Sequence, residues 1–115
     1  MVTFRRISPT FPVRDVPASL AHYARLGFET REYEGGGYGF VARDGIEIHV
    51  GIVSDANVAT SPATAYLYVD DADALADEWR AAGGNVNTPE DTEWGQHEGV
   101  LIDIDGNIIR FGSPL

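Results

Sequence analysis

The sequence predicts an α+β fold made of two half-repeats, each with one strand, one helix and three further strands. The first observation is an internal repeat, in which Val13-Arg14-Asp15 recurs as Val69-Asp70-Asp71 among apolar residues in the same order. The second is a pair of Asp-Gly turns, at 44–45 and 105–106, each between apolar segments as a hairpin requires. The 115 residues suit one domain of two halves, about 1–53 and 64–115, joined by a linker at 54–63.

The ends of both helices are marked in the sequence. Asp15 and Asp71 are the expected N-caps, because a carboxylate accepts hydrogen bonds from the free N–H groups of the first turn. Gly27 and Gly83 are expected to end the helices, since glycine readily adopts the left-handed conformation common at that point. Each half therefore contains one helix of about three turns.

The apolar faces of the two helices predict part of the core. Tyr23 and Trp79 occupy matching positions on these faces, so both are expected to pack inside the protein. Alternating and apolar runs predict the strands. They are expected at 8–13, 28–33, 38–42 and 46–53 in the first half, and at 64–69, 85–87, 98–104 and 108–111 in the second.

Charge and composition bear on the partners. The 18 acidic and 8 basic residues give a net charge of −10, which disfavours nucleic acid and favours a cationic ligand, unless the acidity serves solubility alone. The chain lacks an apolar run long enough for a membrane span and a signal-peptide pattern, so no membrane partner and a cytoplasmic location are expected. The absence of cysteine excludes disulfides and thiolate chemistry.

Three segments carry a family resemblance. They are Phe-Pro-Val-Arg-Asp-Val-Pro-Ala-Ser-Leu-Ala-His-Tyr at 11–23, Tyr-Leu-Tyr-Val-Asp-Asp at 66–71, and Glu-Trp-Gly at 93–95 with Asp-Ile-Asp-Gly-Asn at 103–107. Together they resemble the vicinal oxygen chelate superfamily, which holds glyoxalases, extradiol dioxygenases and bleomycin resistance proteins, and the last segment resembles the bleomycin-resistance branch. The resemblance implies two βαβββ modules forming curved mixed sheets with helices outside. It also implies a homodimer, with or without exchange of modules between chains, in which paired modules form the pocket.

The resemblance also gives the positions at which the enzymes of the superfamily hold a divalent metal. They fall at Ser8 and Thr64 on the first strands, and at His49 and Arg110 on the last strands. Hydroxyl side chains are poor ligands for such ions and a guanidinium repels them. Only His49 could coordinate, with Glu47 on the same face of its strand. We therefore expect neither a metal nor another cofactor.

Two polar groups are candidates for ligand contact. Glu47 and His49 either line the pocket or belong to a solvated polar face. Arg110 either binds an anionic or carbonyl group of a ligand or pairs with Glu47 or Asp103.

Aromatic side chains form the second group of candidates. Trp94 lies in an expected loop, Pro89 to Gly99, that is rich in charge and glycine, and its indole is either a flat wall for a ligand or an anchor in the dimer interface. Tyr38 and Phe40 lie two apart on one strand, and Tyr66 and Tyr68 lie two apart on another. Each pair either lines an aromatic groove or packs on the sheet.

These residues and the resemblance favour metal-free capture of a small molecule, antibiotic-like and cationic, by a homodimer. Glu93 and Glu98 are expected to attract the positive tail of the ligand. No catalytic residue is expected, because no nucleophile motif is present. His97 and Glu98 are neighbours on a strand and point to opposite faces, so they do not form a His–carboxylate pair for acid–base chemistry. The alternatives are a glyoxalase-like, metal-dependent lyase or isomerase with an atypical site around His49, and a structural or regulatory dimer whose cavity its own side chains fill.

Overall fold

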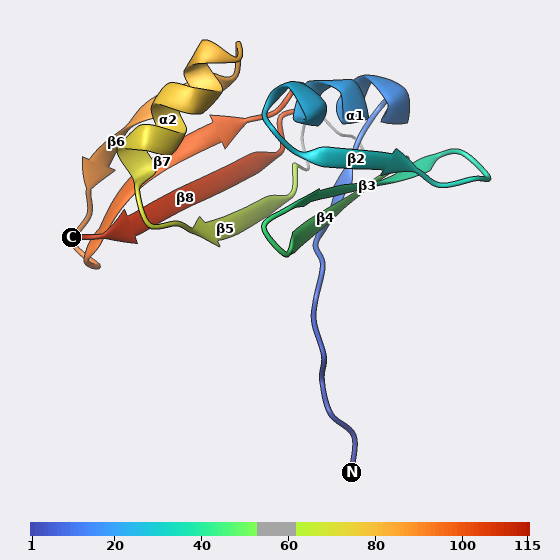
Figure 1. The fold of residues 1–115 in the computed structure, drawn as a ribbon, viewed down its shortest axis with the longest axis horizontal. Helices are drawn as coiled ribbons and strands as arrows, with labels where there is room; N and C mark the ends of the chain where they lie inside the picture. The colour runs from blue at the N-terminus through green and yellow to red at the C-terminus, as the bar shows by residue number, and fades with distance from the viewer. Residues whose placement is uncertain (53–61) are drawn as a thin grey trace.

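The computed structural model describes residues 1–52 and 62–115, which form two βαβββ modules (Figure 1). The predicted linker therefore lies largely outside the described residues. The first module comprises β1 (Thr10–Pro12), α1 (Val16–Arg25), β2 (Glu29–Glu32), β3 (Tyr38–Arg43) and β4 (Ile46–Gly51). The second comprises β5 (Thr64–Tyr68), α2 (Ala72–Ala81), β6 (Asn85–Asp91), β7 (Gln96–Ile102) and β8 (Ile108–Pro114).

Each module contains one mixed sheet with the same strand order. The orders are β1-β4-β3-β2 and β5-β8-β7-β6, in which the first strand runs parallel to the last and the other pairs are antiparallel. A single helix packs on one face of each sheet (Figure 1). The predicted α+β fold with two mixed sheets is confirmed. Among the described residues, no helix is long and apolar enough to cross a membrane.

The helix boundaries follow the predicted capping signals. The side chains of Asp15 and Asp71 each accept a hydrogen bond of 3.0 Å from the amide three residues later. Gly27 and Gly83 follow the last helical residues with φ of 93° and 87°, the left-handed conformation that glycine adopts without strain. These contacts are local, which explains why sequence alone predicts them.

The two strands that precede β8 differ from the predicted ranges, since β6 is longer and β7 begins and ends two residues earlier. β6 continues to Asp91 through Pro89, although proline there was expected to begin a loop. The ladder with β7 shifts register between Asn87 and Glu90, and β6 is an edge strand, so the missing proline N–H breaks no regular ladder. The expected long loop is therefore a short hairpin turn at 92–95.

The core contains residues from both modules. Tyr23 and Trp79 are buried, as predicted. The indole of Trp79 crosses to the first module, where its Nε1 donates a hydrogen bond of 2.9 Å to the carbonyl oxygen of Leu26. Its ring also stacks on Phe28 with a centroid separation of 6.1 Å. Helix α2 thus packs partly on the first module.

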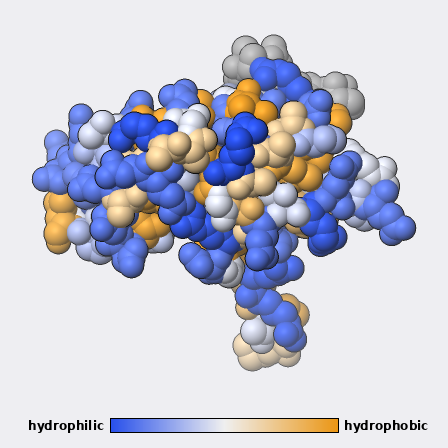
Figure 2. Space-filling view, turned by 45° about the horizontal axis from the view of Figure 1, so that its top comes forward, coloured by the Kyte–Doolittle hydropathy of each residue, from blue (hydrophilic) through white to orange (hydrophobic). Residues whose placement is uncertain are grey.

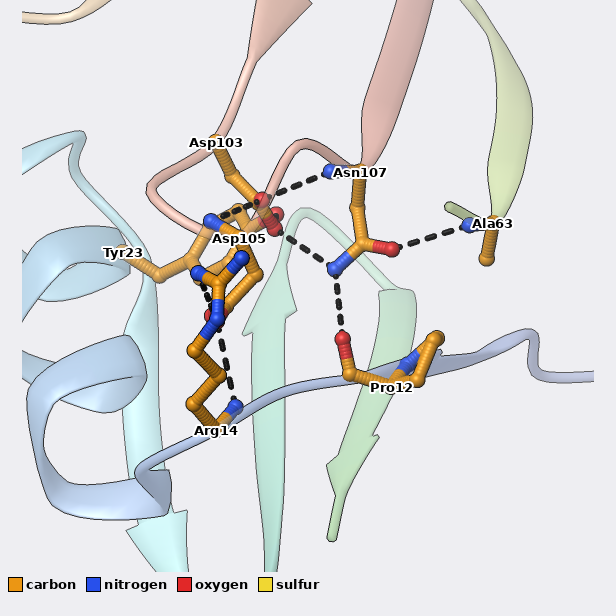
Figure 3. A network of polar contacts seen from close by, with 7 residues as sticks. All are labelled: Pro12, Arg14, Tyr23, Ala63, Asp103, Asp105 and Asn107. Atoms are coloured by element: carbon orange, nitrogen blue, oxygen red, sulfur yellow. Dashed lines mark hydrogen bonds and ion pairs between the residues drawn. The ribbon is translucent and has the colours of Figure 1, made fainter. Parts of the chain in front are cut away.

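A buried polar network joins the β7–β8 turn to the first module (Figure 3). Asp103 accepts a hydrogen bond of 2.7 Å at Oδ2 from the Tyr23 hydroxyl, and two of 2.8 Å at Oδ1 from the amides of Asp105 and Asn107. Asp105 in turn accepts hydrogen bonds of 3.1 and 3.2 Å from the amide and guanidinium of Arg14. We call Tyr23, Arg14, Asp103, Asp105 and Asn107 the inter-module clasp.

The clasp continues through Asn107, and a second side-chain contact also joins the two modules. The Asn107 amide donates to the carbonyl of Pro12 at 2.9 Å and accepts from the amide of Ala63 at 2.9 Å. On the first module, Arg43 forms two hydrogen bonds of 2.6 and 3.0 Å with the Glu78 carboxylate on α2. Each module therefore contacts the helical part of the other through its last β-hairpin.

Candidate functional site

Both sheets have an open face, on the side opposite the packed helix. Alternation along the strands directs every second side chain to this side, because successive residues point to opposite faces. On the first sheet Val41, Ile48 and Val50 point to the helix and are buried. The first open face is formed by Arg31, Tyr38, Phe40, Glu47 and His49, and the second open face by Tyr66, Tyr68, Gln96, Glu98 and Arg110.

Three rings and one cation gather on the first open face. His49 lies opposite Phe40 in the β3–β4 ladder, and Phe40 lies opposite Arg31 in the β2–β3 ladder. The rings of Phe40 and His49 meet edge to face with centroids 5.0 Å apart, and those of Tyr38 and His49 with centroids 5.4 Å apart. The Arg31 guanidinium lies 4.0 Å above the Phe40 ring, a cation–π contact. This face already holds a guanidinium against an aromatic ring.

A chain of short hydrogen bonds runs across the same face. The Tyr38 hydroxyl and His49 Nδ1 are 2.7 Å apart, and His49 Nε2 and Glu47 Oε1 are 2.7 Å apart. The hydrogen bond from His49 and the charge of Arg6, 3.6 Å away, lower the pKa of Glu47. Since an ionised carboxylate can only accept, His49 Nε2 donates to Glu47, and the other ring nitrogen, Nδ1, is the one that contacts Tyr38.

The second open face presents exposed aromatic rings. Tyr68 is 76% exposed, and its ring centroid lies 4.9 Å from that of Tyr66. Trp94, at 66% exposure, lies in the turn between β6 and β7, next to this face. Glu93 lies in the same turn and is exposed. Neither a core role nor a fixed polar partner accounts for these rings within the described residues.

Arg110 does not pair with the residues expected for it. Its guanidinium lies 3.6 Å from Glu98 Oε2, on the neighbouring strand β7. The predicted alternatives, Glu47 and Asp103, are wrong as partners because Glu47 binds His49 and Asp103 belongs to the inter-module clasp. Glu98 is therefore oriented by an arginine through one carboxylate oxygen.

Three polar oxygens of the second open face are buried without a hydrogen-bond partner among the described residues. They are Tyr66 Oη, Gln96 Oε1 and Glu98 Oε1. Loss of solvent and the nearby Glu98 carboxylate raise the pKa of Tyr66. Gln96 is not among the predicted site residues because the strand was expected to begin at 98, whereas alternation from Glu98 places Gln96 on the same face.

A cavity of about 780 Å³ lies between the modules. Its walls include strand β5 with Tyr66 and Tyr68, the β3–β4 hairpin with Glu47, and helix α2 with Leu75 and Trp79. That volume would hold a drug-sized molecule. Of the candidate residues, Glu47, Tyr66 and Tyr68 line this cavity. The others lie outside its walls, among them Tyr38, Phe40, His49 and Trp94.

The side chains at the expected metal positions do not fit a divalent ion. Ser8 and Thr64 offer hydroxyls, and Arg110 brings a positive charge. Within residues 1–52 and 62–115, no three histidine or carboxylate side chains are arranged to hold a metal. His49 has its two ring nitrogens engaged by Tyr38 and Glu47.

Several solved structures share this fold. The bleomycin resistance determinant encoded on transposon Tn5 aligns with a TM-score of 0.85 and 22% identity, over 96% of this chain and 98% of its own. The bleomycin-binding protein of bleomycin-producing Streptomyces verticillus, complexed with copper(II)-bleomycin, aligns with a TM-score of 0.84 and 26% identity over 100% of both chains. A glyoxalase-related enzyme from Clostridium phytofermentans aligns with a TM-score of 0.78 and 18% identity, over 99% of this chain and 98% of its own.

The sequence comparison agrees with the fold. No curated protein sequence matches the chain. The sequence profile of the glyoxalase/bleomycin resistance protein/dioxygenase superfamily, however, matches residues 6–111, nearly the full length. The chain belongs to this superfamily.

Proposed function

We propose that this protein captures a cationic, antibiotic-like small molecule stoichiometrically, as a metal-free homodimer that makes and breaks no bond. The observation that carries the proposal is the exposure of aromatic rings beside carboxylates on the second open face, above all Trp94 and Tyr68. Large exposed rings bind planar or cationic groups through their faces and mark interaction sites. The bleomycin-binding protein of Streptomyces verticillus, named above for its complex, supports the ligand class.

Charge supports a cationic ligand over an anionic one. The net charge of −10 concentrates cations near the surface and speeds their association. On the first open face the Arg31 guanidinium already stacks on Phe40, so a cationic group of a ligand has a preformed partner there. Glu93 and Glu98 bring negative charge to the other face.

The homodimer rests on the amino-terminal arm, residues 1–7. The arm projects from the body of the chain (Figures 1 and 2), and its apolar side chains Met1, Val2, Phe4 and Ile7 are almost fully exposed. Its extended length of about 25 Å is enough to reach across an interface. Strand β5 is a sheet edge beside the apolar cavity, and such an edge accepts an added strand. We propose that the arm of a second copy lies there.

Light scattering during size-exclusion chromatography tests the dimer. The full chain is expected at twice its 12.5 kDa mass, and a variant lacking residues 1–7 is expected to shift toward monomer. The matched control replaces Arg5 and Arg6 with alanine, which keeps the apolar residues of the arm. A full chain that remains monomeric at high concentration would contradict the dimer.

Tryptophan fluorescence tests the capture. The metal-stripped protein is titrated with a bleomycin-type glycopeptide, and saturable quenching at one or two ligands per dimer is expected. Trp94→Phe should remove most of the signal change, because the remaining Trp79 is buried in the core. Tyr33→Phe, which changes an exposed side chain of the first module just after β2, is the control. A flat trace with the wild type would reject this ligand class and favour the structural or regulatory dimer.

A second candidate is the metal-dependent lyase or isomerase with an atypical site at His49. The observation that favours it is the accessible Glu47–His49 pair, joined at 2.7 Å. Glyoxalase-related enzymes also share the fold. Equilibrium dialysis against Zn²⁺ tests this candidate, because His49→Ala should abolish binding of one ion per chain. Absence of stoichiometric zinc in the wild type would reject it.

A further inference from the structure

One arginine of the first open face has an aromatic ring as its partner in place of a carboxylate. The Arg31 guanidinium lies 4.0 Å from the centroid of the Phe40 ring, and within the described parts of the chain its side chain forms no ion pair or hydrogen bond. Glu29 lies two residues away on the same face of β2, yet the guanidinium lies over the ring. Five other arginines lie 2.6–3.6 Å from a carboxylate oxygen, namely Arg6, Arg14, Arg43, Arg80 and Arg110. The ring therefore sets the position of the Arg31 cation.

The covered ring lies at an accessible position. Strand β2 is an edge of its sheet, and Arg31 is exposed on it, opposite Phe40 in the ladder. Phe40 is half-buried, and the rings of Tyr38 and His49 lie beside it with centroids 5.6 and 5.0 Å away. Because the described residues offer the guanidinium no hydrogen bond, rotation about the flexible side chain of Arg31 uncovers this ring face to solvent. A cation from outside can occupy the face only when Arg31 leaves it.

The chemistry of the contact indicates which ligand groups compete for the ring. The face of an aromatic ring carries the negative part of its quadrupole and attracts cations. A guanidinium is weakly hydrated and gives up little water when it stacks, whereas an ammonium is strongly hydrated. The groups that compete best are therefore weakly hydrated organic cations, such as an amidinium, a guanidinium or a quaternary ammonium.

We propose that Arg31 is a built-in competitor for the cation site on Phe40, and that it sets the affinity which a cationic group of a ligand must exceed there. This inference rests on the proposed capture function and adds a residue that determines its specificity. The net charge of −10 concentrates cations of every kind near the surface. Arg31 excludes those that bind the ring weakly.

The strength of the contact sets the size of the effect. A cation–π contact at an exposed site favours the stacked state about twofold to fivefold, so the ring is free in about one third to one sixth of the molecules. The apparent affinity of a ligand falls in proportion to the fraction of molecules that can bind it. Removal of the Arg31 guanidinium should therefore raise the affinity of this ring for a cation about threefold to sixfold.

Nuclear magnetic resonance of the full-length protein, labelled with ¹³C-phenylalanine, tests the competition with tetramethylammonium as the probe. The ring resonances of Phe40, assigned by their loss in Phe40→Leu, report binding at this ring. Arg31→Ala is expected to raise the tetramethylammonium affinity about threefold to sixfold. Arg25→Ala removes an equal charge from an exposed position on α1 and should leave the affinity unchanged. Methylammonium should bind Arg31→Ala more weakly than tetramethylammonium does, because it is more strongly hydrated.

Two results would overturn the competition. An unchanged tetramethylammonium affinity in Arg31→Ala would mean that the guanidinium does not block the ring. An equal rise in Arg25→Ala would mean that net charge controls binding. Arg31→Lys gives a further reading, because it keeps the charge on a flexible side chain but stacks less well, so its affinity should lie between those of the wild type and Arg31→Ala.

The glycopeptide titration keeps this inference separate from the capture function. A rise in tetramethylammonium affinity in Arg31→Ala, without any glycopeptide binding, would support the competition and reject the glycopeptide as ligand class. Where the glycopeptide binds, Arg31→Ala should raise its affinity, and the same change made in Phe40→Leu should not. An equal rise with and without the Phe40 ring would overturn the role of Arg31 in capture even though capture itself occurs.

Discussion

Removal of a single hydroxyl from the inter-module clasp, in Tyr23→Phe, is expected to destabilise the protein measurably. The Tyr23 hydroxyl donates a 2.7 Å hydrogen bond to Asp103 Oδ2, and both groups are buried. Burial and the Asp103 carboxylate raise the pKa of Tyr23 far above its usual range, so the hydroxyl stays a donor at every practical pH. The expected loss is therefore independent of pH between about 5 and 9.

The magnitude follows from the partners that Asp103 keeps. A hydrogen bond to a charged group contributes about 1.5–3 kcal/mol. After the substitution Asp103 still accepts from the amides of Asp105 and Asn107 and from Asn107 Nδ2, so the carboxylate is not left without donors. We therefore expect the lower half of that range, about 2 kcal/mol. At about 4 °C per kcal/mol for a domain of this size, Tm should fall by about 8 °C.

Scanning calorimetry at one fixed protein concentration measures this loss, because dimer formation makes Tm depend on concentration. Tyr33→Phe is the matched control, since its hydroxyl belongs to a side chain that is 54% exposed, and its effect should stay within about 0.5 kcal/mol. A single transition is expected in both, because the clasp joins the modules. A Tyr23→Phe Tm within 2 °C of the wild type would refute the reasoning, and two separate transitions would refute the single domain.

Two further substitutions test other parts of the fold. Hydrogen bonds of 2.8 Å from His97 to Asp73 and to Asp91 raise the pKa of His97. The free energy of unfolding measured in urea should therefore exceed that of His97→Gln by its full amount below about pH 6.5, and this difference should disappear as the pH rises through the raised pKa of His97. A difference that stays constant with pH would contradict this reasoning. In Gly99→Ala the new methyl group meets the Phe111 ring, so a loss of about 1–3 kcal/mol is expected, and an unchanged thermal melt would contradict this packing.

The elements that the sequence predicted well are those encoded by neighbouring residues. Asp15 and Asp71 cap helices that begin within three residues of them. Asp44-Gly45 turns with both φ angles positive, at 50° and 80°, as a tight hairpin requires. In each case the interaction needs no knowledge of the rest of the chain.

The inter-module clasp could not be predicted in this way. The Asp-Ile-Asp-Gly-Asn segment was identified as a hairpin turn and as part of a family resemblance, but its partners Tyr23 and Arg14 lie 80 and 91 residues away. No periodicity or turn rule connects such positions. The structure gives the segment a physical role, since its side chains hold the turn of the second module against the first.

Most residues of the candidate site were predicted from the sequence, but the contacts among them were predicted only in part. Alternation placed Glu47 and His49 on one face, but the partner of Arg110 depended on which strand lies beside β8. Gln96 was missed because Pro89 suggested a loop where the chain continues as strand. Strand boundaries at an edge with a bulge depend on tertiary packing more than on local propensity.

The two open faces differ in a way that bears on recognition. On the first, Tyr38, His49 and Glu47 satisfy one another and Arg31 covers Phe40, so a ligand must displace existing contacts there. On the second, the rings of Tyr68 and Trp94 are exposed. A ligand that stacks on these two rings leaves the hydrogen bonds of the protein in place. On the proposed function, the second module therefore offers the accessible aromatic surface, and on the first a ligand cation competes with Arg31 for the ring of Phe40.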